Sequence, residues 1–196
     1  MNKVRLFGAV LLMMCILTVP CLAEDEILES GDWRYYINDD GTATIDSFTG
    51  EAEEVIVPSE IDGVDVVTIG HGSFIWDNLT SIEIPDSVTT IGEYAFSGCE
   101  SLTSIEIPDS VTTIGNGTFA RCNQLADIKV SPNNKYYAVI DHALFDKKEM
   151  TLLAYPAGLD DDTYSIPSGT LSIGYRAFFF CDNLTSIEIP DSVTTI

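Results

Sequence analysis

Short runs in which apolar and polar residues alternate recur along this chain. Ile82 and Ile84 alternate with the acidic Glu83, which is the pattern of a strand that buries one face. The Pro-Asp-Ser segment 85–87 ends this strand, because proline lacks the amide that a sheet needs and aspartate and serine favour turns. Residues 88–91 are a second β-prone run. The sequence therefore predicts two short strands joined by a tight turn.

The stretch after the second run predicts an arc that returns the chain. Gly92 turns the chain, and residues 93–96 suit a short helical turn or an irregular arc that places Phe96 inward. Cys99 and Leu102 then complete the inner lining. One such coil cannot bury its apolar side alone, so it needs neighbours of the same kind.

The same coil recurs with a period of 23 residues. Residues 82–104, 105–127 and 164–186 each hold one copy, residues 187–196 begin another, and the decapeptide IEIPDSVTTI occurs three times unchanged. Residues 55–81 are a looser copy with a longer turn. We expect the coils to stack, with parallel strands and continuous buried columns. The predicted columns are Ile82/Ile105/Ile187, Ile91/Ile114/Ile173, Phe96/Phe119/Phe178 and Leu102/Leu125/Leu184.

The pattern Leu-x-x-Ile-x-Ile-Pro-x-x-Val-x-x-Ile-Gly-x-x-Ala-Phe-x-x-Cys resembles the BspA-like, or Treponema-pallidum-type, leucine-rich repeat over residues 55–196. The resemblance implies a leucine-rich-repeat solenoid. This is a right-handed β/α superhelix that is mainly β, with short helical or irregular arcs and a parallel strand ladder. The resemblance also implies bacterial cell-surface or secreted proteins, which often act in adhesion.

Two segments depart from the period. Residues 24–54 precede the repeats and carry a hairpin signal, so we expect an N-terminal β-hairpin cap with Trp33 and either Tyr35 or Tyr36 over the first coil. Residues 131–163 are an insertion, which the resemblance implies is an elongated coil. The β-like runs of the insertion are 136–140, 143–145 and 152–155.

The first residues predict an export signal. Lys3 and Arg5 precede a 14-residue apolar run over residues 6–19, and Cys21 and Ala23 are small residues at the two positions that a signal peptidase reads. We expect cleavage of residues 1–23, which would leave no transmembrane segment and would place the product outside the cell or on its surface. A buried N-terminal helix and a lipoprotein signal are the alternatives.

The balance of charge excludes one class of partner. The chain holds 31 Asp and Glu residues against 9 Lys and Arg residues, a formal net charge of -22. A surface of this sign repels phosphate backbones, so we expect no binding of nucleic acid.

Candidate catalytic and metal-binding residues are few. His71 and His142 are the only histidines, and they lie in different kinds of coil, so we expect no enzyme, no cofactor and no metal site. Cys99, Cys122 and Cys181 occupy equivalent positions in their coils and are predicted to be small buried side chains. A disulfide between the first two is the alternative.

The outward positions of the main strands form the candidate binding face, because solenoids bind partners on extended faces. We expect an extracellular protein or glycan as the partner, and a structural spacer without a ligand is the alternative. Acidic rows on this face would suit calcium, although a solvated face without a metal is the prediction. The candidate residues are Thr80, Ser81, Glu83, Thr103, Ser104, Glu106, Asp127, Lys129, Thr185, Ser186 and Glu188.

Phe179 and Phe180 are a second candidate site. They replace the serine and glycine of an earlier coil at positions that should face outward. They are expected either to pack against residues 131–163 or to form an exposed patch for a partner or a second copy. The last repeat is truncated at Ile196, and its uncapped end is a further route to self-association.

Overall fold

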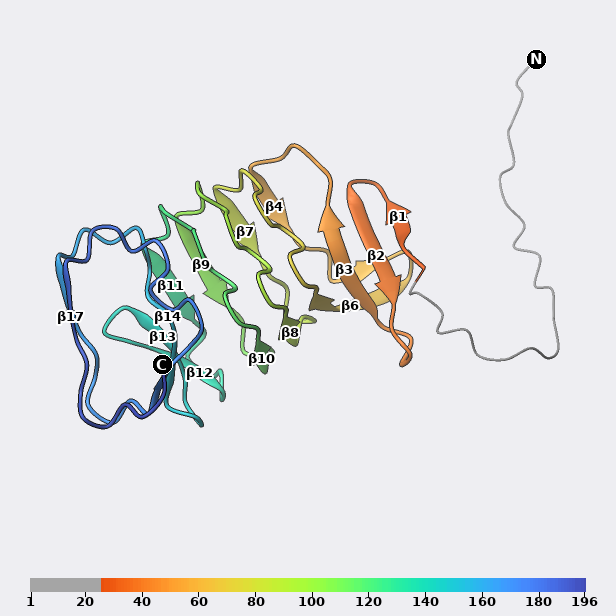
Figure 1. Cartoon of the computed structure of the whole chain (residues 1–196). Coiled ribbons are helices and arrows are strands. Elements are labelled where there is room, and N and C mark those ends of the chain that lie inside the picture. The colour runs from red at the N-terminus through yellow and green to blue at the C-terminus, as the bar shows by residue number, and fades with distance from the viewer. Residues whose placement is uncertain (1–25) are drawn as a thin grey trace, which may run out of the picture.

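The computed structural model describes residues 26–196, which form a β-solenoid of about 6 turns (Figure 1). The predicted export signal, residues 1–23, lies outside the described residues. Strands and turns account for all the regular structure between residues 26 and 196. Accordingly, that part of the chain holds no helix of the length and apolarity needed to cross a membrane.

The predicted main strands line one side of the solenoid. β9 (Ser104–Ile107) and β11 (Asp127–Val130) pair in parallel, with Ile105 opposite Ile128, an offset of 23 residues. β4 (Glu54–Ile56) and β7 (Ser81–Glu83) pair in the same way, with Val55 opposite Ile82. The four strands lie side by side in Figure 1, and β7 is next to β9. The repeat period is therefore the distance along the chain from one coil to the next.

The second β-prone run of each coil forms a second ladder. β6 (Val64–Ile69), β8 (Thr90–Ile91) and β10 (Thr113–Ile114) pair in parallel, so that Ile69, Ile91 and Ile114 lie in one column. β5 (Glu60–Ile61) forms a hairpin with β6 and accounts for the longer turn of the first coil.

The residues before the repeats form three antiparallel strands, β1 (Leu28–Ser30), β2 (Trp33–Ile37) and β3 (Ala43–Phe48). β3 then pairs in parallel with β6, which joins this segment to the second ladder. The Trp33 ring lies 4.9 Å from the Phe48 ring and 6.1 Å from that of Phe74. Tyr35 is buried, and its hydroxyl donates to the Asp62 carboxylate at 2.8 Å. Both side chains thus contact the first coil.

The insertion contains the three strands that its sequence predicts. β12 (Tyr137–Ile140), β13 (Ala143–Asp146) and β14 (Thr151–Ala154) form an antiparallel meander. β14 then pairs in parallel with β16 (Ser172–Ile173), and β15 (Thr163–Ser165) pairs in parallel with β17 (Ser186–Glu188). The ladder therefore resumes after the insertion, with its last strand at the far end of the molecule from β1 (Figure 1).

The predicted columns fill the core. The Phe96 and Phe119 rings stack with centroids 5.9 Å apart and planes 8° from parallel. Phe74 continues this stack on the other side of Phe96 at 5.4 Å. Most column members are buried, and Ile114 is half-buried. Those that follow the insertion belong to a second core cluster, in which Ile173 is buried. The partly exposed members include Phe178, Leu184 and Ile187.

The helical part of the fold prediction is wrong, because the arcs are turns. In the arc at residues 93–98, every second amide donates to a carbonyl of the next coil. Phe96 donates to the Thr118 carbonyl at 3.0 Å, and Gly98 donates to the Ala120 carbonyl at 2.8 Å. Tyr94 and Gly98 also have positive φ angles of 56° and 79°. Because amides committed to the next coil and left-handed residues are both incompatible with an α-helix, the arc stays a series of turns.

Candidate binding faces of the solenoid

The structure brings most of the predicted face together on three neighbouring main strands. Ser81 and Glu83 lie on β7, Ser104 and Glu106 on β9, and Asp127 and Lys129 on β11. Their side chains alternate with buried isoleucines, so they point out of the solenoid. All six are exposed except Ser104, which is half-buried, and Thr103 just before β9 is exposed too.

The C-terminal part of the predicted face lies apart from the rest. Ser186 and Glu188 belong to β17, which pairs with β15 and not with the sheet of β9 and β11. Glu188 accepts a hydrogen bond from the Ser165 hydroxyl at 2.8 Å. The candidate residues therefore form two surfaces, because the insertion separates the coils that carry them.

Two of the candidate threonines hold neighbouring coils together. The Thr80 hydroxyl donates to the Glu53 carbonyl at 3.1 Å, and the Thr185 hydroxyl donates to the Asp162 carbonyl at 3.0 Å. A hydroxyl already engaged with the backbone has less capacity to bind a partner. We therefore assign these two side chains to the solenoid itself.

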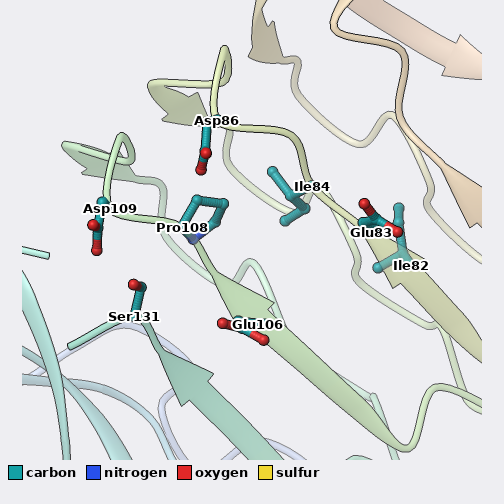
Figure 2. Close-up of a pocket in the computed structure, with 8 residues that line it drawn as sticks. All are labelled: Ile82, Glu83, Ile84, Asp86, Glu106, Pro108, Asp109 and Ser131. Atoms are coloured by element: carbon teal, nitrogen blue, oxygen red, sulfur yellow. The ribbon is translucent and has the colours of Figure 1, made fainter. Parts of the chain in front are cut away.

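A groove of about 500 Å³ runs across β7 and β9 and the turns that follow them. Figure 2 shows Glu83 and Glu106 on neighbouring strands, with Asp86 and Asp109 on the following turns. Four carboxylates from two coils thus line one groove. Its other lining residues are Ile82, Ile84, Pro108 and Ser131.

Two cations lie beside this acidic surface. Lys135 lines a neighbouring pocket together with Asp86 and Asp109, but it forms no ion pair with them. Lys129 is opposite Glu106 in the strand register, but its ammonium group is paired with the Asp127 carboxylate of its own strand at 3.2 Å. Both side chains are more than half exposed, so the ion pair contributes little to stability. The groove keeps its negative charge because Lys129 is neutralised locally. Within residues 26–196, no three histidine, cysteine or carboxylate side chains come together as a metal site.

The three cysteines between residues 26 and 196, two buried and one half-buried, each direct the thiol toward a carbonyl of the coil before. Cys99 donates to the Phe74 carbonyl and Cys122 to the Phe96 carbonyl, each at 3.1 Å. Cys181 makes a longer contact of 3.7 Å to Tyr155. All three are thiols rather than disulfides. Burial raises the pKa of the Cys122 thiol to about 12, which suppresses the nucleophilic thiolate.

Phe179 and Phe180 contact arginines of the arcs. Their rings lie 4.9 Å apart, with the Arg176 guanidinium 4.7 Å from the Phe179 ring. The Arg121 guanidinium lies 4.3 Å from the Phe180 ring. These contacts are on the arc surface and involve no residue of the insertion. Sequence reasoning missed both arginines, although an alignment of the coils places Arg121 in the same position as Phe180.

The comparisons with known proteins agree with this architecture. Residues 160–196 match a family model described as the BspA type leucine rich repeat region (6 copies). The matched segment, residues 160–196, thus carries the BspA-type leucine-rich repeat. A comparison with curated protein sequences gave no match.

Solved structures with a TM-score of 0.50 or more share the fold of this solenoid. The leucine-rich repeat protein of Treponema pallidum is 24% identical, with a TM-score of 0.57 over 87% of this chain and 86% of its own. A leucine-rich repeat protein of Eubacterium ventriosum is 25% identical, with a TM-score of 0.50 over 85% of this chain and 60% of its own. A leucine rich cell surface protein of Faecalibacterium prausnitzii is 23% identical, with a TM-score of 0.44 over 87% of this chain and 72% of its own.

Proposed function

We propose that this protein is an exported binding module whose strand face holds a protein partner through that partner's basic side chains. The observation that carries the proposal is the groove in which Glu83 and Glu106 alternate with Asp86 and Asp109 on adjacent coils (Figure 2). A groove lined by charge of one sign attracts and orients a partner of the opposite sign. Export is inferred from the signal-like residues 1–23.

Binding rather than catalysis is the role that these residues support. The cysteine thiols are buried and have raised pKa values. His71 is exposed with its ring 5.7 Å from that of Tyr94, and His142 lies on the exposed turn between β12 and β13. Neither histidine is arranged as a base beside a nucleophile.

A binding assay against purified extracellular-matrix proteins and immobilised glycans tests the proposal. We expect a matrix protein with a basic segment to bind the wild type and to bind the double variant Glu83→Gln/Glu106→Gln at least several-fold more weakly. The matched control Asp39→Asn/Asp65→Asn removes two exposed charges away from the groove and should bind as the wild type does. Binding of no matrix protein would favour the spacer, and preferential binding of a glycan at this face would contradict the proposed partner class.

A further inference from the structure

The arcs contain two columns of residues with left-handed backbone. Their φ angles lie between 56° and 79° and recur at the same two positions of every regular coil. Glycine adopts this conformation without strain, whereas other L-residues are strained in it. The columns alternate glycine with large side chains: Gly72, Tyr94, Gly117 and Arg176 form one, and Trp76, Gly98, Arg121 and Phe180 form the other.

Stacking of the coils fixes this backbone whatever the side chain. The Trp76 amide donates to the Ser97 carbonyl at 2.9 Å, and the Gly98 amide, one coil further, donates to Ala120 at 2.8 Å. Tryptophan and glycine thus make the same bond at the same φ. Since glycine satisfies the fold with less strain, the large side chains in these columns call for a reason other than backbone geometry.

In one column, the rings and an arginine stack across the coils. A Cβ atom on Gly98 would lie 2.4 Å from the Trp76 ring, so this ring occupies the space that glycine leaves. The Arg121 guanidinium lies 4.6 Å from the centroid of the Trp76 ring and 4.3 Å from that of Phe180. The cation is therefore in contact with two rings from coils far apart in sequence.

The other column repeats the arrangement. A Cβ atom on Gly117 would lie 2.7 Å from the Tyr94 ring, which extends over that glycine. The Arg176 guanidinium lies 5.3 Å from the Tyr94 ring, 5.1 Å from that of Tyr175 and 4.7 Å from that of Phe179. We give the name arc ribbon to the large side chains of the columns together with the neighbouring rings of Tyr175 and Phe179. The ribbon consists of Trp76, Tyr94, Arg121, Tyr175, Arg176 and Phe179.

Much of the arc ribbon is exposed to solvent, whereas Tyr94 and Arg121 are half-buried. Trp76 is 53% exposed, Tyr175 54% and Phe179 36%. Across residues 26–196, neither Arg121 nor Arg176 forms an ion pair, although the chain holds 31 acidic residues. A guanidinium stacked on a ring keeps its N–H donors in its own plane, at its edge. Exposed aromatic rings together with arginine are the composition of binding hot spots.

We propose that the arc ribbon binds a neutral polysaccharide. Aromatic faces suit the apolar faces of sugar rings, and the guanidinium edges can donate to hydroxyl groups. The carboxylates of Asp77 and Glu93, next to Trp76 and Tyr94 in the chain, supply acceptors for the same hydroxyls. The net charge of -22 disfavours an anionic polymer. The ribbon crosses several coils, which favours an extended ligand over a single sugar. This site is distinct from the acidic groove.

Affinity electrophoresis in native gels tests the proposal with the purified protein. The probes are a mixed-linkage β-glucan, a xyloglucan and a galactomannan, with anionic polygalacturonate and polyglutamate as comparisons. At least one neutral polymer is expected to retard the protein, and the two anions are not. The proposal would be overturned if no neutral polymer retarded the protein. It would also be overturned if polygalacturonate or polyglutamate retarded the protein as strongly as the neutral polymers do.

Replacing Trp76 by glycine, the residue at the same position of the next coil, separates binding from folding. Trp76→Gly removes the ring and relieves the left-handed strain, so it should keep the thermal midpoint while weakening apparent affinity by roughly tenfold or more. Tyr175→Ala/Phe179→Ser removes rings at positions without positive φ and should have the same effect.

Ile56→Thr removes another exposed apolar side chain, 68% exposed on β4, and should leave retardation unchanged. So should Glu83→Gln/Glu106→Gln, which keeps this test independent of the acidic groove. Retardation of both ribbon variants at the wild-type level would refute the site.

Discussion

The Cys122 thiol donates to the carbonyl of Phe96, one coil back, at 3.1 Å. Cys99 makes the same bond to Phe74, at the same distance. At these two steps the cysteine thus gives a second donor to an arc carbonyl that already accepts a backbone amide of its own coil, and this bond between coils explains its place in the repeat without any redox chemistry.

These thiols predict a loss of stability in alkali. Burial holds the pKa of Cys122 at about 12 in the folded protein, against a reference of 9.0. Above pH 9 the thiol ionises in the unfolded chain while it stays neutral in the folded protein. Ionisation stabilises the unfolded state, so the free energy of unfolding falls as the pH rises from 9 toward 12. Tyr164, with a buried hydroxyl and a pKa of about 12, acts in the same direction.

Urea unfolding at pH 8 and pH 10.5 measures this loss, and alkylation of the folded protein at pH 8 should be far slower than that of the unfolded chain. Rapid alkylation of Cys122 without unfolding would contradict its burial.

The phenylalanine stack predicts a large cost of truncation. Phe96→Ala should lower the free energy of unfolding by about 3–5 kcal/mol, because it empties a fully buried site between Phe74 and Phe119. Glu83→Ala on the outer face should change it by no more than about 0.5 kcal/mol. Equal losses in urea unfolding would show that the faces are assigned wrongly.

A glycine of an arc and a glycine of a strand-ending turn predict different costs for the same substitution. Gly98 and Gly169 both have positive φ, so Gly→Ala costs about 1–2 kcal/mol at either position from the backbone alone. Only at Gly98 does the new methyl group meet a ring, that of Trp76 at 2.4 Å, since Gly169 faces open space. Thermal unfolding should therefore show the larger loss for Gly98→Ala, with part of it recovered in the double variant Gly98→Ala/Trp76→Gly.

The hydrogen bonds of the Asn134 side chain predict a large loss of stability when that side chain is removed. Its amide donates to the carbonyls of Pro108 at 2.7 Å and Val111 at 3.0 Å. Its side-chain oxygen accepts from the amides of Tyr136 and Tyr137. Asn134→Ala removes the partner of the Val111 carbonyl and of the amides of Tyr136 and Tyr137, while the Pro108 carbonyl keeps the Val111 amide. We therefore expect a loss of about 3 kcal/mol in the free energy of unfolding.

The neighbouring exposed residue provides the control for this prediction: Asn133→Ala should change stability by no more than about 0.5 kcal/mol. Denaturant titration of both variants gives the comparison, and similar values would show that the Asn134 network is dispensable.

Export predicts the first residue of the secreted protein. N-terminal sequencing of material released by the producing cells should begin at Glu24, because the signal-like segment ends at Ala23. Soluble intracellular protein that retains Met1 would contradict this prediction.

The sequence predicts the structural features that recur in every coil. Ile82, Phe96 and Leu102 recur at intervals of 23 residues, so their stacking and their facing follow from the period, and the structure confirms both. The conformation of the arcs was harder to predict, because the same local residues suit a helical turn and a series of turns. What decides between them is the carbonyl of the next coil, which accepts the amides that a helix would use.

The candidate faces were predicted only in part. Glu83 and Glu106 follow from the alternation of the strands, but their groove depends on Asp86 and Asp109 in the turns. The contact of Arg121 with Phe180 was out of reach, because it joins coils separated by the insertion. Asn134 gives no signal in the sequence, since its partners are backbone groups of another coil.

The offset of 23 residues between paired strands has a consequence for the gene. Each regular coil contacts its neighbours through the same register, and the decapeptide IEIPDSVTTI is identical in three coils. Unequal recombination between such copies adds or removes a whole coil and leaves every remaining interface of the same kind. The length of the solenoid, and with it the extent of its binding surface, can therefore vary between descendants without a new fold.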